Sequence, residues 1–269
     1  MRLATWNVNS IRARVDRVLA FLERSETDVL AMQETKCRPE QFPIDPFEAA
    51  GYRIVSHGLN QWNGVAIASR VGLDDVVTSF PGQPAFGDPD PVIEARAIGA
   101  LCGGVRVWSV YVPNGRALDH PHFAYKVSFL EALKNAASGW AGGPDPVAIV
   151  GDWNVAPRDV DAWDPSDPDI ATHVAPSVRE AFSSFAGVGY LEVSRIVVPD
   201  ERRYTFWDYQ RLRFPRNEGL RIDHAYASRP LADRATVGTI DREERKGQGA
   251  SDHVPVIMDF APDPGTVLS

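Results

Sequence analysis

Polar side chains interrupt the apolar runs of this sequence at six places where a strand is expected to begin or end. They are Asn7, Gln33-Glu34-Thr35, Tyr111 to Gly115, Gly151 to Asn154, Asp223 and Ser251-Asp252-His253. Any one of these would ordinarily be a turn or a helix cap. Six such places together indicate a functional site, because functional groups collect at strand ends on open α/β sheets.

The side chains at these places are mostly oxygen donors, with one histidine and no thiol. Glu34, Asp152, Asp223 and Asp252 are acids, and His253 is a base. Hard oxygen ligands favour Mg²⁺ or Mn²⁺ over zinc, and protein-bound Mg²⁺ usually leaves positions for phosphate and water. The pattern therefore predicts phosphate ester chemistry with Mg²⁺, for which Mn²⁺ could substitute.

Three other classes of enzyme lack their motifs in this chain. We find no nucleophile elbow of a serine hydrolase, no glycine-rich Lys-Ser/Thr loop of a nucleoside triphosphatase, and no glycine fingerprint of a dinucleotide-binding fold.

The apolar spacing predicts alternating strands and helices. The expected strands are residues 3–8, 28–32, 52–56, 64–69, 75–79, 92–101, 105–112, 146–150, a segment near Tyr204, 222–227 and 254–260. Three helices are expected. The first follows Ser10, which would be its N-cap, and the other two cover 121–140 and 178–185. No Ser- or Gly-rich linker divides them, so we predict a single α/β domain over 1–260 and a frayed tail over 261–269.

Composition places the chain among ordinary globular proteins. Its 269 residues are 44% hydrophobic and 24% charged. We find no apolar run near the ~18 residues of a membrane span and no secretory signal. Cys37 and Cys102 form no Cys-x-x-Cys pair and are expected to be reduced thiols. These observations predict a cytoplasmic protein without membrane contact.

The net charge of −8 argues against bulk attraction to nucleic acid. One local stretch is different, because residues 201–221 hold six arginines and three acids, interleaved with five aromatic residues. This mixture can stack on bases while neutralising phosphates. The alternative is a solvated edge whose aromatic rings belong to the core.

One short motif occurs twice. Trp6-Asn7-Val8 and Trp153-Asn154-Val155 each follow an expected buried strand. The repeat is consistent with a duplicated half, and chance similarity of two strand ends is the alternative.

Taken in order, the motifs resemble exodeoxyribonuclease III and the abasic-site endonucleases of the endonuclease/exonuclease/phosphatase superfamily. The resemblance rests on Trp6 to Arg12, Leu30 to Lys36, Tyr111 to Gly115, Gly151 to Pro157, Leu220 to Asp223 and Ser251 to Val256. Tyr204 to Tyr209 and Arg221-Ile222-Asp223 favour the abasic-site nuclease branch over the phosphatase and sphingomyelinase branches. The resemblance implies a four-layered α/β sandwich of two packed mixed sheets flanked by helices.

The resemblance also implies roles for individual residues. Glu34 would be the principal Mg²⁺ ligand, and the wider metal-binding set is Asn7, Glu34, Asp152, Asn154, Asp252 and His253. The catalytic set is Tyr111, Asp152, Asn154, Asp223 and His253. Within it, Asp223 would orient His253, and Asp152 would act as base for water or as acid for the leaving group. DNA contacts are expected at Asn114, Arg116, Phe206, Trp207 and Leu220.

The leading hypothesis is a Mg²⁺-dependent DNA repair nuclease. It would cut 5′ to abasic sites and at 3′ ends of duplex DNA, as a monomer. A phosphomonoesterase of the same superfamily, acting on a small phosphorylated substrate, is the first alternative. A catalytically silent nucleic-acid-binding module is the second, although intact Glu34, Asp152, Asp223 and His253 argue against it.

Overall fold

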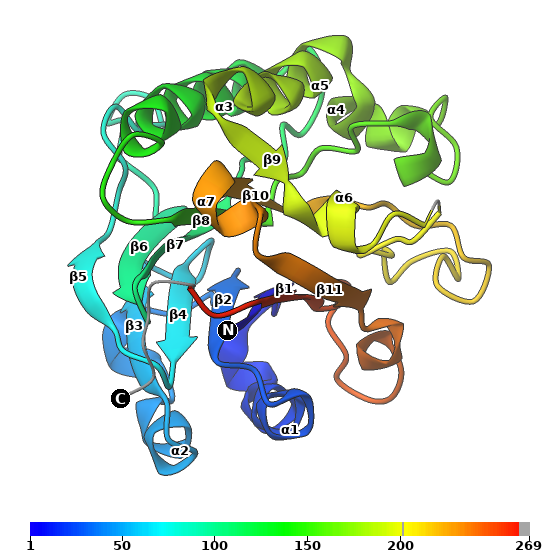
Figure 1. Cartoon of the computed structure of the whole chain (residues 1–269). Coiled ribbons are helices and arrows are strands. Elements are labelled where there is room, and N and C mark those ends of the chain that lie inside the picture. Colours follow the sequence, from blue (N-terminus) through cyan, green and yellow to red (C-terminus); the bar gives the residue numbers. More distant parts are fainter. Residues whose placement is uncertain (201, 264–269) are drawn as a thin grey trace.

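The chain folds into four layers, in which two sheets pack face to face and helices cover their outer sides (Figure 1). This is a computed structural model, and it describes residues 1–200 and 202–263. The four-layered α/β prediction is confirmed.

The first sheet has the strand order β11-β12-β1-β2-β4-β3. Its strands are β1 (Arg2–Asn7), β2 (Val29–Gln33), β3 (Arg53–His57), β4 (Val65–Ser69), β11 (Ala235–Ile240) and β12 (Val256–Phe260). The β1–β2 pair is parallel and the other pairs are antiparallel. The sheet is therefore mixed, as predicted.

The second sheet has the order β5-β6-β7-β8-β10-β9. Its strands are β5 (Asp74–Val77), β6 (Ala97–Cys102), β7 (Val105–Tyr111), β8 (Val147–Asp152), β9 (Tyr190–Glu192) and β10 (Asp223–Ser228). Again one central pair, β7–β8, is parallel, and its neighbours are antiparallel.

Helices connect and cover the sheets. The α-helices of the described residues are α1 (Val15–Ser25), α2 (Ile44–Ala49), α3 (Pro121–Trp140), α4 (Ala171–Val174), α5 (Pro176–Ser183), α6 (Val193–Val197) and α7 (Arg229–Ala232). Short 3₁₀ turns are η1 (Ile11–Ala13), η2 (Pro39–Gln41), η3 (Asp159–Asp161), η4 (Pro168–Ile170), η5 (Ser184–Val188) and η6 (Arg242–Arg245). None of the helices in the described part of the chain has the length and apolarity to cross a membrane.

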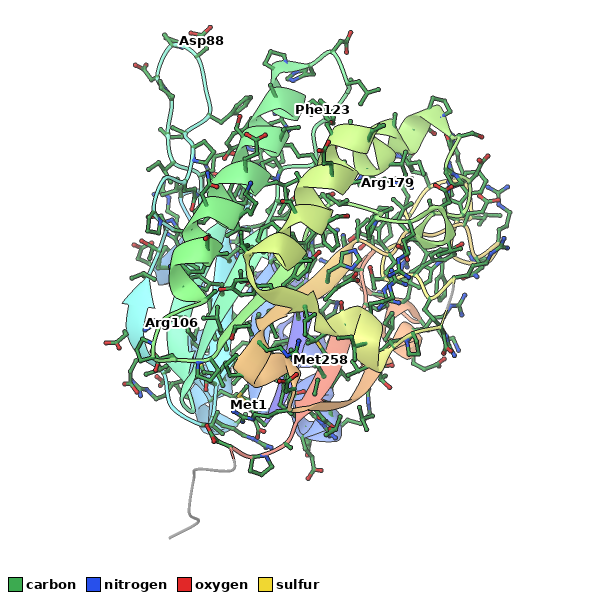
Figure 2. All side chains as sticks on the ribbon, turned by 45° about the horizontal axis from the view of Figure 1, so that its top comes forward. Met1, Asp88, Arg106, Phe123, Arg179 and Met258 are labelled. Atoms are coloured by element: carbon green, nitrogen blue, oxygen red, sulfur yellow. The ribbon has the colours of Figure 1, made fainter. Side chains whose placement is uncertain are left out.

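Strand alternation divides the apolar side chains between three core layers. Leu3 of β1 lies in the layer between the sheets, whereas Ala4 and Trp6 pack on the outer side against α1. On the opposite side of the molecule, α3 and α5 lie over the second sheet (Figure 2). Asp88 marks the tip of a loop that projects beside the start of α3 in the same view.

The first helix does not start at its predicted cap. Ser10 has a φ of 87°, and its side chain makes no capping hydrogen bond. Its backbone N–H instead donates to the carbonyl of Glu34 at 2.7 Å, and Ile11 donates to Thr35. The prediction was wrong because the chain after β1 is bonded to the segment after β2, and α1 begins only at Val15.

Two strand predictions also need correction. The segment near Tyr204 is irregular, and only isolated bridges join Phe206 to Leu220 and to His253. Residues 92–101 form a strand only from Ala97. The sequence pattern did not predict the edge strand β11 or the short helix α2, because their apolar periodicity is weak.

The repeated Trp-Asn-Val motif occupies equivalent positions. β1 and β8 each stand third in their sheet, counted from the edges formed by β11 and β9. The indole of Trp6 donates to the carbonyl of His253 and that of Trp153 to the carbonyl of His224, both at 3.1 Å. Two structurally similar strand ends therefore face each other across the sandwich.

The predicted single domain and frayed tail remain predictions. Ala261 exchanges hydrogen bonds with Arg234 in both directions. Residues 264–269 lie outside the described part of the chain.

Replacing Gly151 by alanine should destabilise the protein, because a Cβ there would lie 1.9 Å from the carbonyl oxygen of Val110 on the paired strand. We expect a loss of about 2–3 kcal/mol in the free energy of unfolding, measured by urea denaturation. Gly139, near the end of α3, has open space around its Cβ position. Gly139→Ala is the matched control and should be neutral or stabilising by up to about 1 kcal/mol. Equal stability of the two variants would contradict this account.

His122 on α3 should make stability depend on pH. Its Nδ1 accepts from the N–H of Gly115 at 3.1 Å. Burial, with the nearby arginines 96 and 116, lowers the pKa of His122 to about 4. The unfolded chain binds this proton near pH 6.5. Stability present above pH 6.5 is therefore lost as the pH falls towards 4.

His122→Gln keeps an acceptor but cannot titrate. Between pH 7.5 and 5 the wild type should lose about 1 kcal/mol more than this variant, after allowing for solvent screening. Urea unfolding at both pH values measures the difference. The same pH dependence in both proteins would rule out His122 as its source.

Candidate active site

The polar residues predicted for the site lie at one edge of the sandwich, because the strands that carry them begin or end there. Asn7, Tyr111 and Asp152 end the strands β1, β7 and β8, and Glu34 directly follows β2. Asp223 begins β10, which runs antiparallel to β8 and pairs Asp223 with Asp152. The carboxyl ends of parallel strands and the amino ends of their antiparallel neighbours share an edge. Five separate segments thereby supply one site.

Asn7 joins the two sheets at this edge. Its Nδ2 donates to Glu34 Oε1 at 2.8 Å and to Asp152 Oδ2 at 3.0 Å, and its Oδ1 accepts from the N–H of Asn9. Asn7 is fully buried. A fixed amide thus holds a carboxylate from each sheet at one point.

His253 lies between two aspartates. Its Nδ1 is 2.8 Å from Asp223 Oδ2, and its Nε2 is 3.7 Å from Asp152 Oδ2. Burial alone would lower the pKa of His253, but the two carboxylates outweigh it and raise the pKa to about 10. The two carboxylates therefore favour the imidazolium form of His253. Asp223 makes the contact that the resemblance implies, and the role of this contact in a reaction stays a prediction.

The pKa values of the two carboxylates held by Asn7 are shifted in opposite directions. Burial raises the pKa of Asp152 to about 7, with Asp223 and Glu34 adding to the shift while His253 opposes it. Burial would also raise the pKa of Glu34, but the ammonium of Lys36 at 2.8 Å and the Asn7 amide hold it below its usual value. One carboxylate is thus poised to move a proton, and the other stays charged.

Tyr111 remains a neutral phenol. Burial and the charge of Glu34 raise its pKa well above the usual value, although Arg96 opposes the shift. The guanidinium of Arg96 stacks on the Tyr111 ring, 4.8 Å from its centroid. A neutral tyrosine can donate a hydrogen bond or a proton to a phosphate oxygen.

The site fits a divalent metal ion. One ligand atom each from Glu34, Asp152 and His253 lies within 4.8 Å of the others. The two carboxylates are hard oxygen donors that repel each other at this distance, which a cation would relieve. Asp252 lies at the margin, where its Oδ1 accepts from Asn9. The amide of Asn154 lies in the cavity wall, where one N–H of its Nδ2 donates to the carbonyl of Val112.

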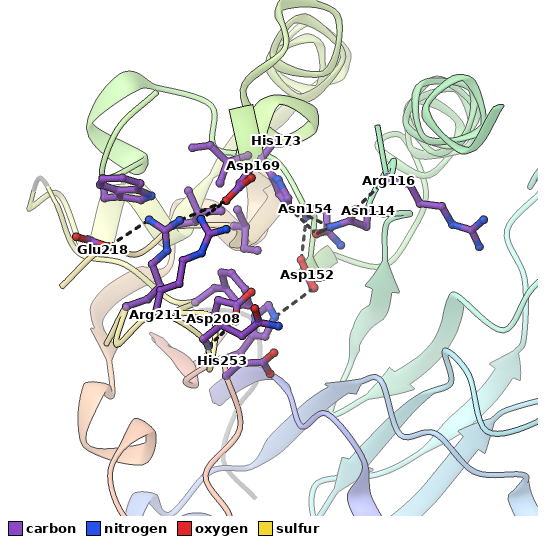
Figure 3. Close-up of a pocket in the computed structure, with 18 of the residues that line it drawn as sticks. Asn114, Arg116, Asp152, Asn154, Asp169, His173, Asp208, Arg211, Glu218 and His253 are labelled. Carbon is purple, nitrogen blue, oxygen red and sulfur yellow. Dashed lines mark hydrogen bonds and ion pairs between the residues drawn. The ribbon is translucent and has the colours of Figure 1, made fainter. Parts of the chain in front are cut away.

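The cluster opens into a cavity of about 600 Å³ (Figure 3). Ten of the predicted site residues line it, namely Glu34, Tyr111, Asn114, Arg116, Asp152, Asn154, Phe206, Leu220, Asp252 and His253. Asn7 and Asp223 lie behind this wall, in contact with lining residues.

Trp207 is the exception among the predicted contacts. It is 1% exposed and packs edge-on against Tyr204 and Phe214 beneath the cavity. The adjacent Phe206 does line the cavity, where its ring lies 4.8 Å from that of His253. The two residues are neighbours in an irregular segment, in which one side chain lines the cavity and the other is buried in the core.

The arginine-rich stretch forms part of the cavity wall. Arg211 and Arg213 reach across to Asp169 and Asp167, and Arg213 also stacks on Trp163. Figure 3 shows Arg211 directed at Asp169. Arg221 is buried and donates to backbone carbonyls. The stretch is therefore partly cavity lining and partly core, and its contact with bases and phosphates stays a prediction.

Two residues at the site escaped the sequence analysis. His173 lines the cavity with its Nε2 3.1 Å from Asn154 Oδ1. It lies in a segment without periodicity, so no local signal marked it. Lys126 lies behind Asn154. The sequence could have indicated Lys126, because its spacing places a charged residue on the apolar face of α3 that carries Leu130 and Leu133.

Glu34→Gln should weaken metal binding, because it removes one of the two carboxylate charges of the cluster. We expect the affinity for Mn²⁺, measured by calorimetric titration, to fall at least about 10-fold. Glu40→Gln on the exposed turn η2 is the matched control and should bind as the wild type does. Unchanged affinity of the Glu34 variant would refute the assigned metal position.

Comparison with known proteins agrees with this geometry. A model of the endonuclease/exonuclease/phosphatase family matches residues 4–253. Exodeoxyribonuclease III of Haemophilus influenzae is 27% identical over 274 residues, which cover 97% of this chain and 100% of that protein.

Solved structures are closer in sequence. An AP endonuclease from Archaeoglobus fulgidus is 34% identical with a TM-score of 0.87, and the 3′-5′ exonuclease NExo from Neisseria meningitidis is 35% identical with a TM-score of 0.88. A structure of the 3′ phosphatase NExo from Neisseria bound to a product DNA hairpin is 34% identical with a TM-score of 0.89. Each covers 97% of this chain and is itself 99% covered. The chain therefore belongs to the endonuclease/exonuclease/phosphatase family, in the nuclease branch that includes exodeoxyribonuclease III and the AP endonucleases.

Proposed function

We propose that this DNA repair nuclease uses Mg²⁺ to hydrolyse phosphoester bonds at the 3′ ends of duplex DNA. The observation that carries the proposal is the meeting of Glu34, Asp152 and the His253 imidazolium at one polar cavity. The names of the Haemophilus and Neisseria relatives, an exodeoxyribonuclease III and a 3′-5′ exonuclease or 3′ phosphatase, support the choice of 3′ ends.

Each step of hydrolysis has a residue to serve it. The imidazolium of His253 and the phenol of Tyr111 would bind the nonbridging oxygens of the phosphate and stabilise the charge that develops on them. Asp152 would accept the proton of the attacking water or supply one to the departing 3′ oxygen. Asn154, next to Asp152 on the cavity wall, would hold the phosphoryl group in line.

A metal ion would be held by Glu34 and Asp152, with Asn7, Asn154 and Asp252 around it. The imidazolium of His253 has no free lone pair for a metal and would contact the phosphate instead. When bound, Mg²⁺ supplies positive charge that polarises the phosphoryl group. Asn114 and Arg116 line the cavity and would contact the sugar-phosphate backbone.

Incision 5′ to abasic sites is a second proposed activity. Phe206, Leu220 and Ile222 give the cavity an apolar side next to His253. A deoxyribose without a base unstacks cheaply and can fill such a space, whereas an intact nucleotide is bulkier. The name of the Archaeoglobus relative, an AP endonuclease, supports this activity.

A labelled-duplex assay separates the two activities. We expect Mg²⁺-dependent release of nucleotides or of a terminal phosphate from a recessed 3′ end, and a single cut at an internal abasic-site analogue in a duplex with blocked ends. EDTA should abolish both reactions, and Glu34→Ala should lower both by at least about 100-fold. The exposed-site variant Glu40→Gln should behave as the wild type does.

The outcomes discriminate between the proposals. Cleavage only at 3′ ends would refute the abasic activity and leave the first proposal standing. Inertness towards every DNA, with rapid phosphate release from a small phosphomonoester, would replace both with the phosphomonoesterase alternative. DNA binding without any hydrolysis would favour the silent binding module.

We also propose that the protein acts as a monomer in the cytoplasm. The apolar faces of both sheets are covered by helices of the same chain. Cys37 and Cys102 are free and buried, which suits a reducing compartment.

A further inference from the structure

A fully buried lysine lies directly behind the site. Lys126 projects from α3 and is 0% exposed. Its Nζ donates to the backbone carbonyls of Asn114 at 3.1 Å, Asn154 at 2.6 Å and Thr172 at 2.8 Å. These bonds use all three N–H donors of an ammonium group.

Such an arrangement is costly unless every donor is satisfied. Burying an ammonium ion away from water costs several kcal/mol, and hydrogen bonds must offset it. Burial lowers the pKa of Lys126 to about 7, and the charge of Asp152 opposes that shift. The three carbonyls are satisfied together only by the charged form.

The three carbonyls come from three separate segments, and each segment carries a residue of the cavity wall. Asn114 lies between β7 and α3, Asn154 follows β8, and Thr172 precedes His173 in α4. On the cavity side, the side chains that these segments carry contact one another. Asn154 Oδ1 lies 3.5 Å from Asn114 Nδ2 and 3.1 Å from His173 Nε2. Lys126 thus ties together from behind the segments whose side chains converge in front.

The backbone of these segments also adopts positive φ angles. Asn154 has a φ of 51°, in the left-handed region, while its N–H donates to Asp152 Oδ1 at 2.9 Å. Gly115 has a φ of 101°, and a Cβ there would lie within 3.3 Å of Thr172, Phe123 and Lys126. Non-glycine residues seldom adopt positive φ unless their surroundings hold them there.

We propose that Lys126 is a positioning residue of the reaction, which holds Asn154 at the phosphoryl group by binding its carbonyl together with those of Asn114 and Thr172. The inference rests on the proposed nuclease function. It gives α3, which contributes no predicted catalytic side chain, a defined part in that function. A misplacement of about 1 Å in a catalytic group can lower a rate on the order of 100-fold.

Lys126→Met tests the proposal, because methionine fills similar space without any donor. With a recessed-end duplex and saturating Mg²⁺, we expect kcat to fall on the order of 10- to 100-fold while KM for DNA changes less than about 3-fold. Lys134→Met, two turns further along α3, is the matched control and should keep wild-type kinetics. A Lys126→Met enzyme with wild-type kcat would overturn the proposal.

Lys126→Arg keeps the test decisive if the methionine variant does not fold. Arginine retains the charge, but its planar fork cannot direct three donors of one nitrogen at converging carbonyls. We expect a folded protein with kcat between those of the wild type and Lys126→Met. A wild-type kcat in Lys126→Arg would show that the three-carbonyl arrangement is not needed.

A double-mutant cycle separates positioning from general packing. If Lys126 acts through Asn154, adding Lys126→Met to Asn154→Ala should lower kcat less than about 2-fold further. A further loss of 10-fold or more would refute the positioning role. Failure of the proposed function is distinguishable, because the wild-type enzyme itself would then leave every DNA intact.

Discussion

The hydrogen bonds of the Asn7 amide to Glu34 and Asp152 are the contact on which the rest of the site depends. Glu34 belongs to the first sheet and Asp152 to the second, so the contact fixes how the two strand edges face each other. Below it, Gln33 donates to Thr5 and Ser109, which links the sheets through a second buried polar layer. Because buried polar groups need hydrogen-bond partners, both layers stabilise the observed packing of one sheet on the other.

That contact also sets the electrostatics of the cavity. Three acids, Glu34, Asp152 and Asp223, crowd into a buried space, and the cationic groups beside them are Lys36 and His253. The pKa values therefore diverge, with Asp152 raised, Glu34 lowered and His253 raised. Divergent titration of adjacent groups is what acid–base chemistry on a phosphate requires. A divalent cation would complete the compensation of negative charge.

The two sheets hold the strand ends at the site by the same hydrogen bond. In each sheet a tryptophan at the end of the third strand bonds to the carbonyl of a histidine that follows an aspartate. The histidines then differ in function, because His253 projects into the cavity while His224 bonds within the core to Val155 and Glu192. The same backbone arrangement thus places one histidine in the cavity wall and the other in the core.

The sequence by itself determined most of the fold and the identity of the polar set. Apolar spacing placed β1, β2, β7, β8, β12 and α3, and the polar residues beside the strands marked Glu34, Asp152 and His253. Tertiary structure decided which of these side chains touch, because Asn7 bonds to Glu34 across 27 residues of sequence and to Asp152 across 145. It also turned Trp207 inward, bonded Ser10 to the Glu34 segment and buried Lys126 behind Asn154. Local periodicity reports only which face of an element is apolar, whereas these outcomes depend on the partners that the other sheet and helices bring to that face.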